Sequence, residues 1–167
     1  MTRTASLLAP LALLGALGGC GLQPMYAGGG SGAVAQGLAA VEVAPIEGRA
    51  GWLVRNALKD RLAQSGGTAT PRYRLDVLLD DQLESLGLLT DETVSRERRT
   101  LRARYQLVDL SNGTILLDAT AGSDAGIDVV SSEFATIAAE QTALENLAVE
   151  VSDRIMIRVT LALRSQS

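Results

Sequence analysis

The chain has 167 residues, with 15 lysines and arginines, 19 aspartates and glutamates, and no histidine. A net charge of −4 argues against nucleic acid as a general partner, and the lack of histidine removes the commonest general base and metal ligand. The sequence also contains no GxSxG, HExxH, P-loop or glycine-rich dinucleotide motif. We therefore predict a protein that is not an enzyme and uses no metal or cofactor.

The first segment has the pattern of an export leader, with Arg3, an apolar run over residues 5–17, and small residues before Cys20. This run is too short to span a bilayer. The stretch Leu17-Gly18-Gly19-Cys20 resembles the lipobox of bacterial lipoproteins, in which the leader is removed before an acylated cysteine. The resemblance implies a signal peptide over residues 1–19.

Acylation of Cys20, for example with palmitate, would anchor the chain, because two or three acyl chains make release from a membrane very slow. Gly21 follows the cysteine in place of the aspartate typical of inner-membrane retention, which favours the periplasmic side of the outer membrane. The alternative is a soluble exported protein with a buried thiol. Residues 20–38 are rich in glycine and predict a flexible tether, so the folded domain is expected over residues 39–167.

The domain is predicted to start with a short strand at Val41 and Val43, ended by Pro45. A helix follows over residues 52–64, where Val54, Leu58 and Leu62 recur at helical spacing. A strand, a helix and a further strand in this order indicate a parallel pair joined by a crossover.

Three alternating strands are predicted next, over residues 73–81, 93–110 and 114–121, with their apolar side chains at odd positions. A three-residue turn at 111–113, with Gly113 in the left-handed conformation, pairs Leu107 with Leu117 and Tyr105 with Ala119. The residues expected to face inward are Tyr73, Leu75, Val77, Leu79, Leu101, Ala103, Tyr105, Leu107, Ile115, Leu117, Ala119 and Ala121.

A long final helix is expected from Ser132, with Ser131 or Ser132 as its cap and Glu133 in its first turn, to about Leu163. Its predicted apolar stripe is Phe134, Ile137, Ala138, Leu144, Leu147, Ala148, Val151 and Ile155. The fold class is therefore α+β. We predict a two-layer sandwich in which two helices cover one face of a four-stranded mixed sheet, in the order β-α-β-β-β-α.

Several stretches resemble the LPS-assembly lipoprotein family, LptE. The matching residues are Cys20-Gly21-Leu22-Gln23-Pro24-Met25-Tyr26, Ala103-Arg104-Tyr105-Gln106-Leu107-Val108-Asp109, and Phe134-Ala135. The resemblance implies a non-catalytic outer-membrane subunit that plugs the LptD β-barrel, assists its assembly and binds lipopolysaccharide on its way to the cell surface.

Two other functional classes remain open. The first is an auxiliary lipoprotein of an ABC-type lipid transporter. The second is a lipid-tethered periplasmic enzyme that uses carboxylates such as Asp80 and Asp81, or Asp124 and Asp128. Paired acids in turns more often serve as turn formers than as catalysts.

Four arginines, Arg96, Arg98, Arg102 and Arg104, fall at even positions of the third strand and form a line on its uncovered face. Arginine binds phosphate through its planar fork, and lipid A carries phosphates, so this line is a candidate lipopolysaccharide site. The favoured alternative is a solvated charge ladder with Asp76, Asp80 and Asp118, in which each pair contributes roughly a few tenths of a kcal/mol.

Two apolar features are candidates for partner contact. Residues 83–89 are expected to form a loop that is more apolar than a free hairpin tip, and we predict that Leu86, Leu88 and Leu89 contact a partner. The alternative is that these leucines fold back onto the core. Trp52 is either an interface anchor or, more often for such a residue, a cap on the core.

Overall fold

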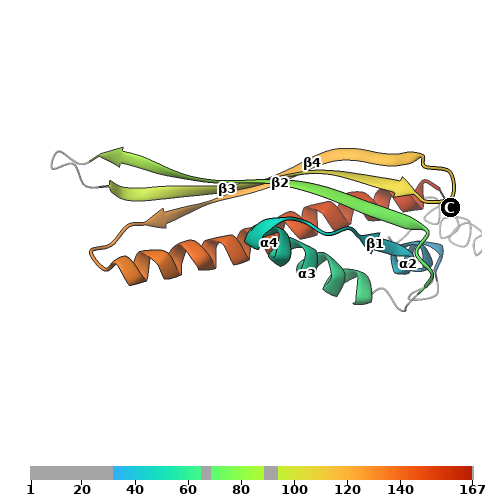
Figure 1. The fold of residues 1–167 in the computed structure, drawn as a ribbon, viewed down its shortest axis with the longest axis horizontal. Helices are drawn as coiled ribbons and strands as arrows, with labels where there is room; N and C mark the ends of the chain where they lie inside the picture. Colours follow the sequence, from blue (N-terminus) through green and yellow to red (C-terminus); the bar gives the residue numbers. More distant parts are fainter. Residues whose placement is uncertain (1–31, 65–68, 89–93, 167) are drawn as a thin grey trace, which may run out of the picture.

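The computed structural model describes residues 32–64, 69–88 and 94–166, so Cys20, the leader and Leu89 lie outside the described residues. One layer is a sheet, and the helices of the described chain lie together against one of its faces (Figure 1). The elements are α2 (Ala33–Ala39), β1 (Val41–Val43), α3 (Gly48–Gln64), β2 (Tyr73–Leu88), β3 (Val94–Asp109), β4 (Ile115–Asp128) and α4 (Glu133–Arg164).

The sheet has the strand order β1-β2-β3-β4, with β1 parallel to β2 and the other pairs antiparallel. This confirms the predicted four-stranded mixed sheet and α+β fold. β2 and β4 run further than predicted, to Leu88 and Asp128, because their outer halves pair along the whole of β3. Gly122, Ser123 and Gly126, which lie beyond the predicted end of β4, are paired with β3 in this ladder.

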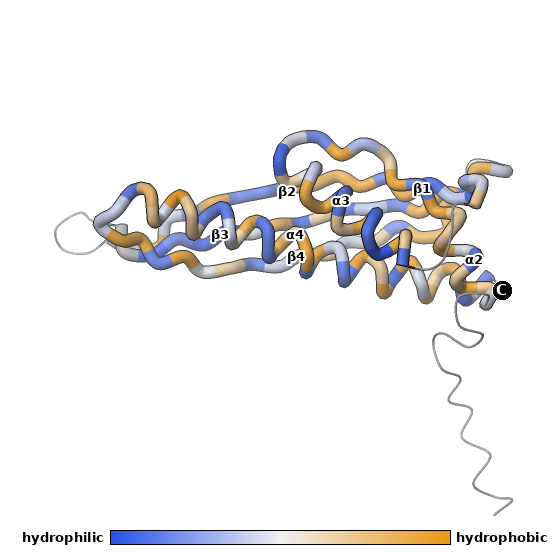
Figure 2. The backbone as a smooth tube through the Cα atoms, turned by 90° about the horizontal axis from the view of Figure 1, so that it is seen from below, coloured by the Kyte–Doolittle hydropathy of each residue, from blue (hydrophilic) through white to orange (hydrophobic). Residues whose placement is uncertain are grey.

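The core lies between the sheet and the helices, where the predicted apolar faces meet. Tyr105 and Leu107 of β3 are almost fully buried, together with Leu58 of α3 and Val151 of α4. The long helix α4 runs beneath the sheet, with α3 at its side and α2 near its C-terminal end (Figures 1 and 2). These positions confirm most of the inward-facing residues predicted from the alternation of the strands.

The tether prediction is wrong for its last residues, because α2 begins at Ala33, ahead of the expected domain boundary at 39. Leu38 is only 1% exposed, and Gly37 lies close to the side chain of Leu163 on α4. Ala35 and Leu38, one helical turn apart, are buried against the core. The glycine-rich composition of the segment did not reveal these two apolar contacts. The α3 helix also begins earlier than predicted, at Gly48.

The first turns of α4 do not join the core, contrary to the predicted stripe. Phe134 is 87% exposed and Ile137 is 43% exposed, whereas Leu144, Leu147 and the later stripe residues are buried. Next to these turns the sheet makes a polar contact with α4, in which Arg99 of β3 donates to the carbonyl oxygen of Glu140. The helix still starts as expected, with Ser132 at the N-cap position, although the Ser132 side chain makes no capping bond.

The β3–β4 hairpin has the predicted register but not the predicted turn. Leu107 pairs with Leu117, and Gly113 has a positive φ of 74°. However, the turn closes between the Asp109 N–H and the Thr114 carbonyl oxygen (2.9 Å), and a register shift pairs Val108 with Ile115. The loop is one residue longer than predicted and an irregularity in β4 compensates, so Ile115 is exposed instead of facing inward.

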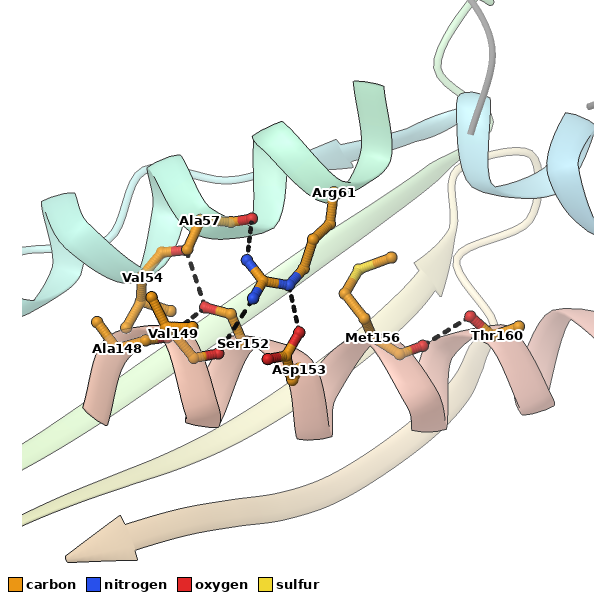
Figure 3. A network of polar contacts seen from close by, with 9 residues as sticks. All are labelled: Val54, Ala57, Arg61, Ala148, Val149, Ser152, Asp153, Met156 and Thr160. Carbon is orange, nitrogen blue, oxygen red and sulfur yellow. Dashed lines mark hydrogen bonds and ion pairs between the residues drawn. The ribbon is translucent and has the colours of Figure 1, made fainter. Parts of the chain in front are cut away.

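A polar network joins α3 to α4 within the helical layer (Figure 3). The Arg61 Nε lies 2.5 Å from Asp153 Oδ1, and Arg61 Nη1 also donates to the carbonyl oxygen of Ala57. The hydroxyl of the fully buried Ser152 donates to the Ala148 carbonyl oxygen at 2.6 Å, with the Val54 carbonyl oxygen 3.4 Å away. The Arg61–Asp153 and Ser152–Val54 contacts fix the two helices against each other.

Candidate functional site

The candidate site is the open face of the sheet, which no helix of the described chain covers (Figure 1). We call the surface formed by the even-numbered side chains of β2, β3 and β4 the open face. Strand register arranges its central part in rows, with one residue from each strand. These rows are Asp76, Gln106 and Asp118; Leu78, Arg104 and Thr120; and Asp80, Arg102 and Gly122.

Three of the four candidate arginines pair with carboxylates of β4. Arg96 Nε lies 3.2 Å from an Asp128 oxygen, Arg98 Nε lies 3.8 Å from Asp124, and Arg104 Nη2 lies 3.1 Å from Asp118. Of the predicted charge ladder, only the Arg104–Asp118 pair is confirmed, because Arg96 and Arg98 pair with Asp128 and Asp124 and not with Asp76 or Asp80. Asp76 instead binds Arg74 of its own strand, and Asp80 accepts hydrogen bonds from Gln82.

The Arg104–Asp118 pair shifts the pKa values of both of its groups. The hydrogen bond that Arg104 donates to Asp118 raises the pKa of the Arg104 guanidinium. In turn, the pKa of the Asp118 carboxyl is lowered by hydrogen bonds from Arg104 and then from Gln106, which lies 2.8 Å away. Both groups stay ionised at neutral pH, and neither is tuned to exchange protons there.

Arg102 differs from its neighbours, because within the described residues it has no hydrogen bond and no ion pair. Asp80 on one side of Arg102 is engaged by Gln82, and Gly122 on the other side offers no side chain. A Cβ atom at Gly122 would lie 3.3 Å from the Arg102 Cγ, so glycine at this position leaves room for the arginine stem. The guanidinium is left available to a ligand.

A shallow hollow of ≈ 430 Å³ surrounds this arginine on the open face. Leu78, which is 74% exposed, lies in it beside Arg102, Thr120 and Gly122. An exposed leucine next to an unpaired guanidinium and a hydroxyl suits an amphiphilic anion, since the apolar and the charged parts of such a ligand each find a matching group.

The carboxylates proposed for an enzyme all have polar partners. Asp80 accepts from Gln82, Asp81 from Arg99, Asp124 pairs with Arg98, and Asp128 pairs with Arg96. Moreover, Asp80 and Asp81 are adjacent in β2 and so point to opposite faces of the sheet. Among the described residues, no group of three or more histidines, cysteines or acids is arranged to hold a metal ion.

Comparison with known protein families finds one that matches most of the chain. The model of the family described as lipopolysaccharide-assembly, LptE, matches residues 38–159. The chain belongs to the LptE family. This membership identifies it as a lipopolysaccharide-assembly lipoprotein and agrees with the resemblance seen in the sequence. No match was found among curated proteins.

Solved structures share the LptE-family fold. A putative lipoprotein from Caulobacter crescentus is 26% identical with a TM-score of 0.67, and the match covers 81% of this chain and 98% of that one. Rare lipoprotein B from Shewanella oneidensis is 11% identical with a TM-score of 0.58, over 76% and 96% of the two chains. A minor lipoprotein from Acinetobacter baumannii is 13% identical with a TM-score of 0.59, over 73% and 91%.

The leucine-rich segment of this LptE-family chain is not the loop that the sequence predicted. Residues 83–88 belong to β2, where Leu86 is half-buried opposite Arg96, and Leu88 pairs with Val94. Leu83 is 44% exposed. Trp52 is 64% exposed on α3, so the core-cap interpretation of this residue is wrong. In the described part of the chain, no helix has the length and apolar character needed to cross a membrane.

Sequence reasoning missed Arg99, which lies on the helix-facing side of β3. Its Nε and Nη2 donate to the two carboxylate oxygens of Asp81 at 2.8 and 2.7 Å, and the same hydrogen bonding raises the pKa of Arg99. Arg99 sits at an odd position, where the neighbouring strand residues Leu101 and Ala103 face inward. That interruption of the apolar alternation is the signal that marks where the apolar core ends and a polar contact with α4 begins.

Proposed function

We propose that this chain is the non-catalytic partner of an LptD-like outer-membrane β-barrel, which it plugs and helps to assemble, and that it contacts lipopolysaccharide on the open face. In this proposal, acylated Cys20 anchors the chain on the periplasmic side of the outer membrane. The observation that carries the proposal is the unpaired Arg102 beside the exposed Leu78, in a hollow of the open face.

The chemistry of lipopolysaccharide matches this hollow better than that of a purely polar ligand. Lipid A presents phosphates next to acyl chains, and Arg102 and Leu78 present a guanidinium next to an apolar side chain. Of the four candidate arginines, Arg102 is the one with no ion pair among the described residues, so phosphate binding there does not require breaking one, even though Asp80 lies opposite it and lines the same hollow. We therefore assign the direct contact to Arg102 and a supporting role to Arg96, Arg98 and Arg104.

The proposed barrel contact rests on the shape of the sheet. β2, β3 and β4 form a long, thin layer with one face free of helices (Figure 1). Its charges are largely neutralised in ladder pairs with β4, so a polar wall can approach without meeting a strong field of one sign. Leu86 and Leu88 near the end of β2, and Leu89 beyond it, remain the proposed apolar contacts with the partner.

Two measurements test the proposal. Affinity purification of the full-length chain from a membrane extract should recover a large β-barrel protein, whereas an inner-membrane ABC transporter would favour the alternative function. For lipopolysaccharide, Arg102→Ala should weaken binding about tenfold, which corresponds to one lost charge-assisted hydrogen bond. Arg49→Ala, on the exposed side of α3, is the matched control because it removes the same charge elsewhere.

A further inference from the structure

A second hollow, of ≈ 370 Å³, lies on the other side of β4, between this strand and α4. Tyr105 of β3 reaches it from the core side, and Arg154, Ile157 and Arg158 reach it from α4. It shares Thr120, Ala121 and Gly122 with the open-face hollow but lies on the other side of the sheet, because Tyr105 and Arg102 lie at odd and even positions of the same strand and so point to opposite faces. None of the residues that line it is acidic.

Tyr105 is 1% exposed, and its hydroxyl has no hydrogen-bond partner within the described residues. Burial raises the pKa of this hydroxyl, while the positive charge of Arg158 lowers it, so the guanidinium lies near enough to act on the phenol. A buried hydroxyl without a partner costs free energy. The two arginines of the hollow have only donor groups, so they cannot accept a hydrogen bond from the Tyr105 hydroxyl. An acceptor for this hydroxyl has to come from a ligand.

The two arginines of the hollow differ in how they are held. Arg154 is fixed to β4, since Nη1 donates to the Gly122 carbonyl oxygen and Nη2 contacts the Ser123 hydroxyl at 3.3 Å, with Glu150 3.8 Å away. Arg158 has no hydrogen bond or ion pair in the described part of the chain, and its side chain is exposed. The hollow therefore contains one positioned cation, one free cation and one unsatisfied hydroxyl donor.

We propose that this hollow binds a phosphate group, with the Arg158 guanidinium and the Tyr105 hydroxyl as its direct ligands and Arg154 as a fixed neighbouring charge. A phosphate has several acceptor oxygens and a negative charge. It therefore complements a lining that has two cations, a hydroxyl donor and no acidic residue. Ile157, 51% exposed, lines the same hollow and suits an apolar chain carried by the phosphate. The source is either free phosphate or a phospholipid headgroup.

The proposal is tested by NMR on the full-length protein, labelled with ¹³C at the tyrosine Cζ, in maltoside micelles. The chain has three tyrosines, and Tyr105→Phe identifies the signal of interest. Inorganic phosphate is titrated at constant ionic strength, and phosphatidylglycerol is added to the micelles in a separate arm. We expect a saturable shift of the Tyr105 signal, and about tenfold weaker binding in Arg158→Ala.

Lys59→Ala is the matched control, because it removes one positive charge from the exposed side of α3 and should leave the affinity unchanged. A shift with both probes identifies phosphate in general as the ligand, and a shift with phosphatidylglycerol alone identifies a lipid headgroup. If neither probe produces a shift, the proposal is overturned, and it is also overturned by a shift that Arg158→Ala leaves unaltered. Arg102→Ala should also have no effect here, which separates this site from the open-face site.

Discussion

Arg99 and Asp81 form a two-pronged ion pair beneath the sheet, and their side chains are only 16% and 24% exposed. The pair joins β3 to β2 on the side that faces α4, at the position where the apolar core gives way to polar contacts. It is far less exposed than the Arg96–Asp128 pair of the open face, at 63% and 77%. Water therefore competes less with its hydrogen bonds.

Breaking this pair should destabilise the fold. We expect Asp81→Ala to lower the free energy of unfolding by about 1–3 kcal/mol, because it leaves the Arg99 guanidinium without its carboxylate acceptor, and with the Glu140 carbonyl oxygen alone, in a poorly hydrated position. Asp128→Ala, which breaks the exposed pair, should change stability by less than about 0.5 kcal/mol. Urea unfolding of both variants measures the contrast, and equal losses would contradict it.

Tyr105→Phe should leave the free energy of unfolding unchanged or raise it, by up to about 1 kcal/mol in the absence of ligand. The substitution removes a buried hydroxyl that has no partner in the described residues, while keeping the ring that packs in the core. Thermal unfolding in a phosphate-free buffer makes the comparison. A clear loss of stability would mean that the hydroxyl is already satisfied in the folded protein.

Asp109 should make the fold sensitive to acid. The hydroxyl and the backbone N–H of Ser111 hold the pKa of the Asp109 carboxyl below its usual range, with a smaller contribution from Arg72. A carboxyl with a depressed folded pKa stabilises the fold above its unfolded pKa, which is about 3.9. That stability is lost as the pH falls through the folded pKa.

Asp109→Asn should therefore be less stable than the parent protein at pH 7, and the difference should shrink as the pH falls below the ordinary pKa of the carboxyl and through its lowered folded pKa. Ser111→Ala removes one of the hydrogen bonds that cause the shift, so it should show a smaller version of the same effect. Unfolding midpoints between pH 2.5 and 7 provide the measurement. A difference that persists unchanged in acid would point to packing in place of charge.

Phe134→Ala should not alter stability measurably, because its side chain is 87% exposed at the start of α4. Leu147→Ala, between three and four turns later on the same helix, should cost about 2–5 kcal/mol, since Leu147 is 1% exposed in the core. Chemical unfolding distinguishes the two. A large loss of stability in Phe134→Ala would contradict the finding that the first turns of α4 lie outside the core.

Cys20→Ala should release the protein from membranes without preventing its folding. The proposed acyl chains act only on attachment, and the described core contains no residue before Ala35. Fractionation of cells and circular dichroism of the soluble variant provide the two readouts. The released variant should still bind the proposed barrel partner in solution, and a variant that cannot fold would show that anchoring and folding are linked.

The sequence predicted the sheet and its main core because alternation and helical spacing report burial directly. Val54 and Leu58 on α3, and Tyr105 and Leu107 on β3, are buried as predicted. The same patterns do not show how far an element extends, since the outer half of β4 is rich in small and polar residues, whose place in the strand depends on the ladder with β3 and on bonds to α4. They also failed for Phe134, because helical spacing does not show whether a partner layer is present.

The candidate site was predicted only in outline. Even positions of β3 placed four arginines on one face, yet they did not show which one lacks a carboxylate, because that depends on the neighbours across the sheet. Arg102 lies free since register places Gly122 beside it and Gln82 engages Asp80. The hollow at Tyr105 was missed entirely, because it is formed by residues of three separate elements that only tertiary packing brings together.

Gly122 lies at the border of both hollows, and its missing side chain affects each in a different way. On the open face it leaves space for the stem of Arg102, and at the strand edge its carbonyl oxygen holds Arg154. A bulky substitution at this one position would perturb both surfaces together. Variants at Arg102 and Arg158 are the pair that can separate the two binding activities genetically, and Gly122 is the position that should never be used to do so.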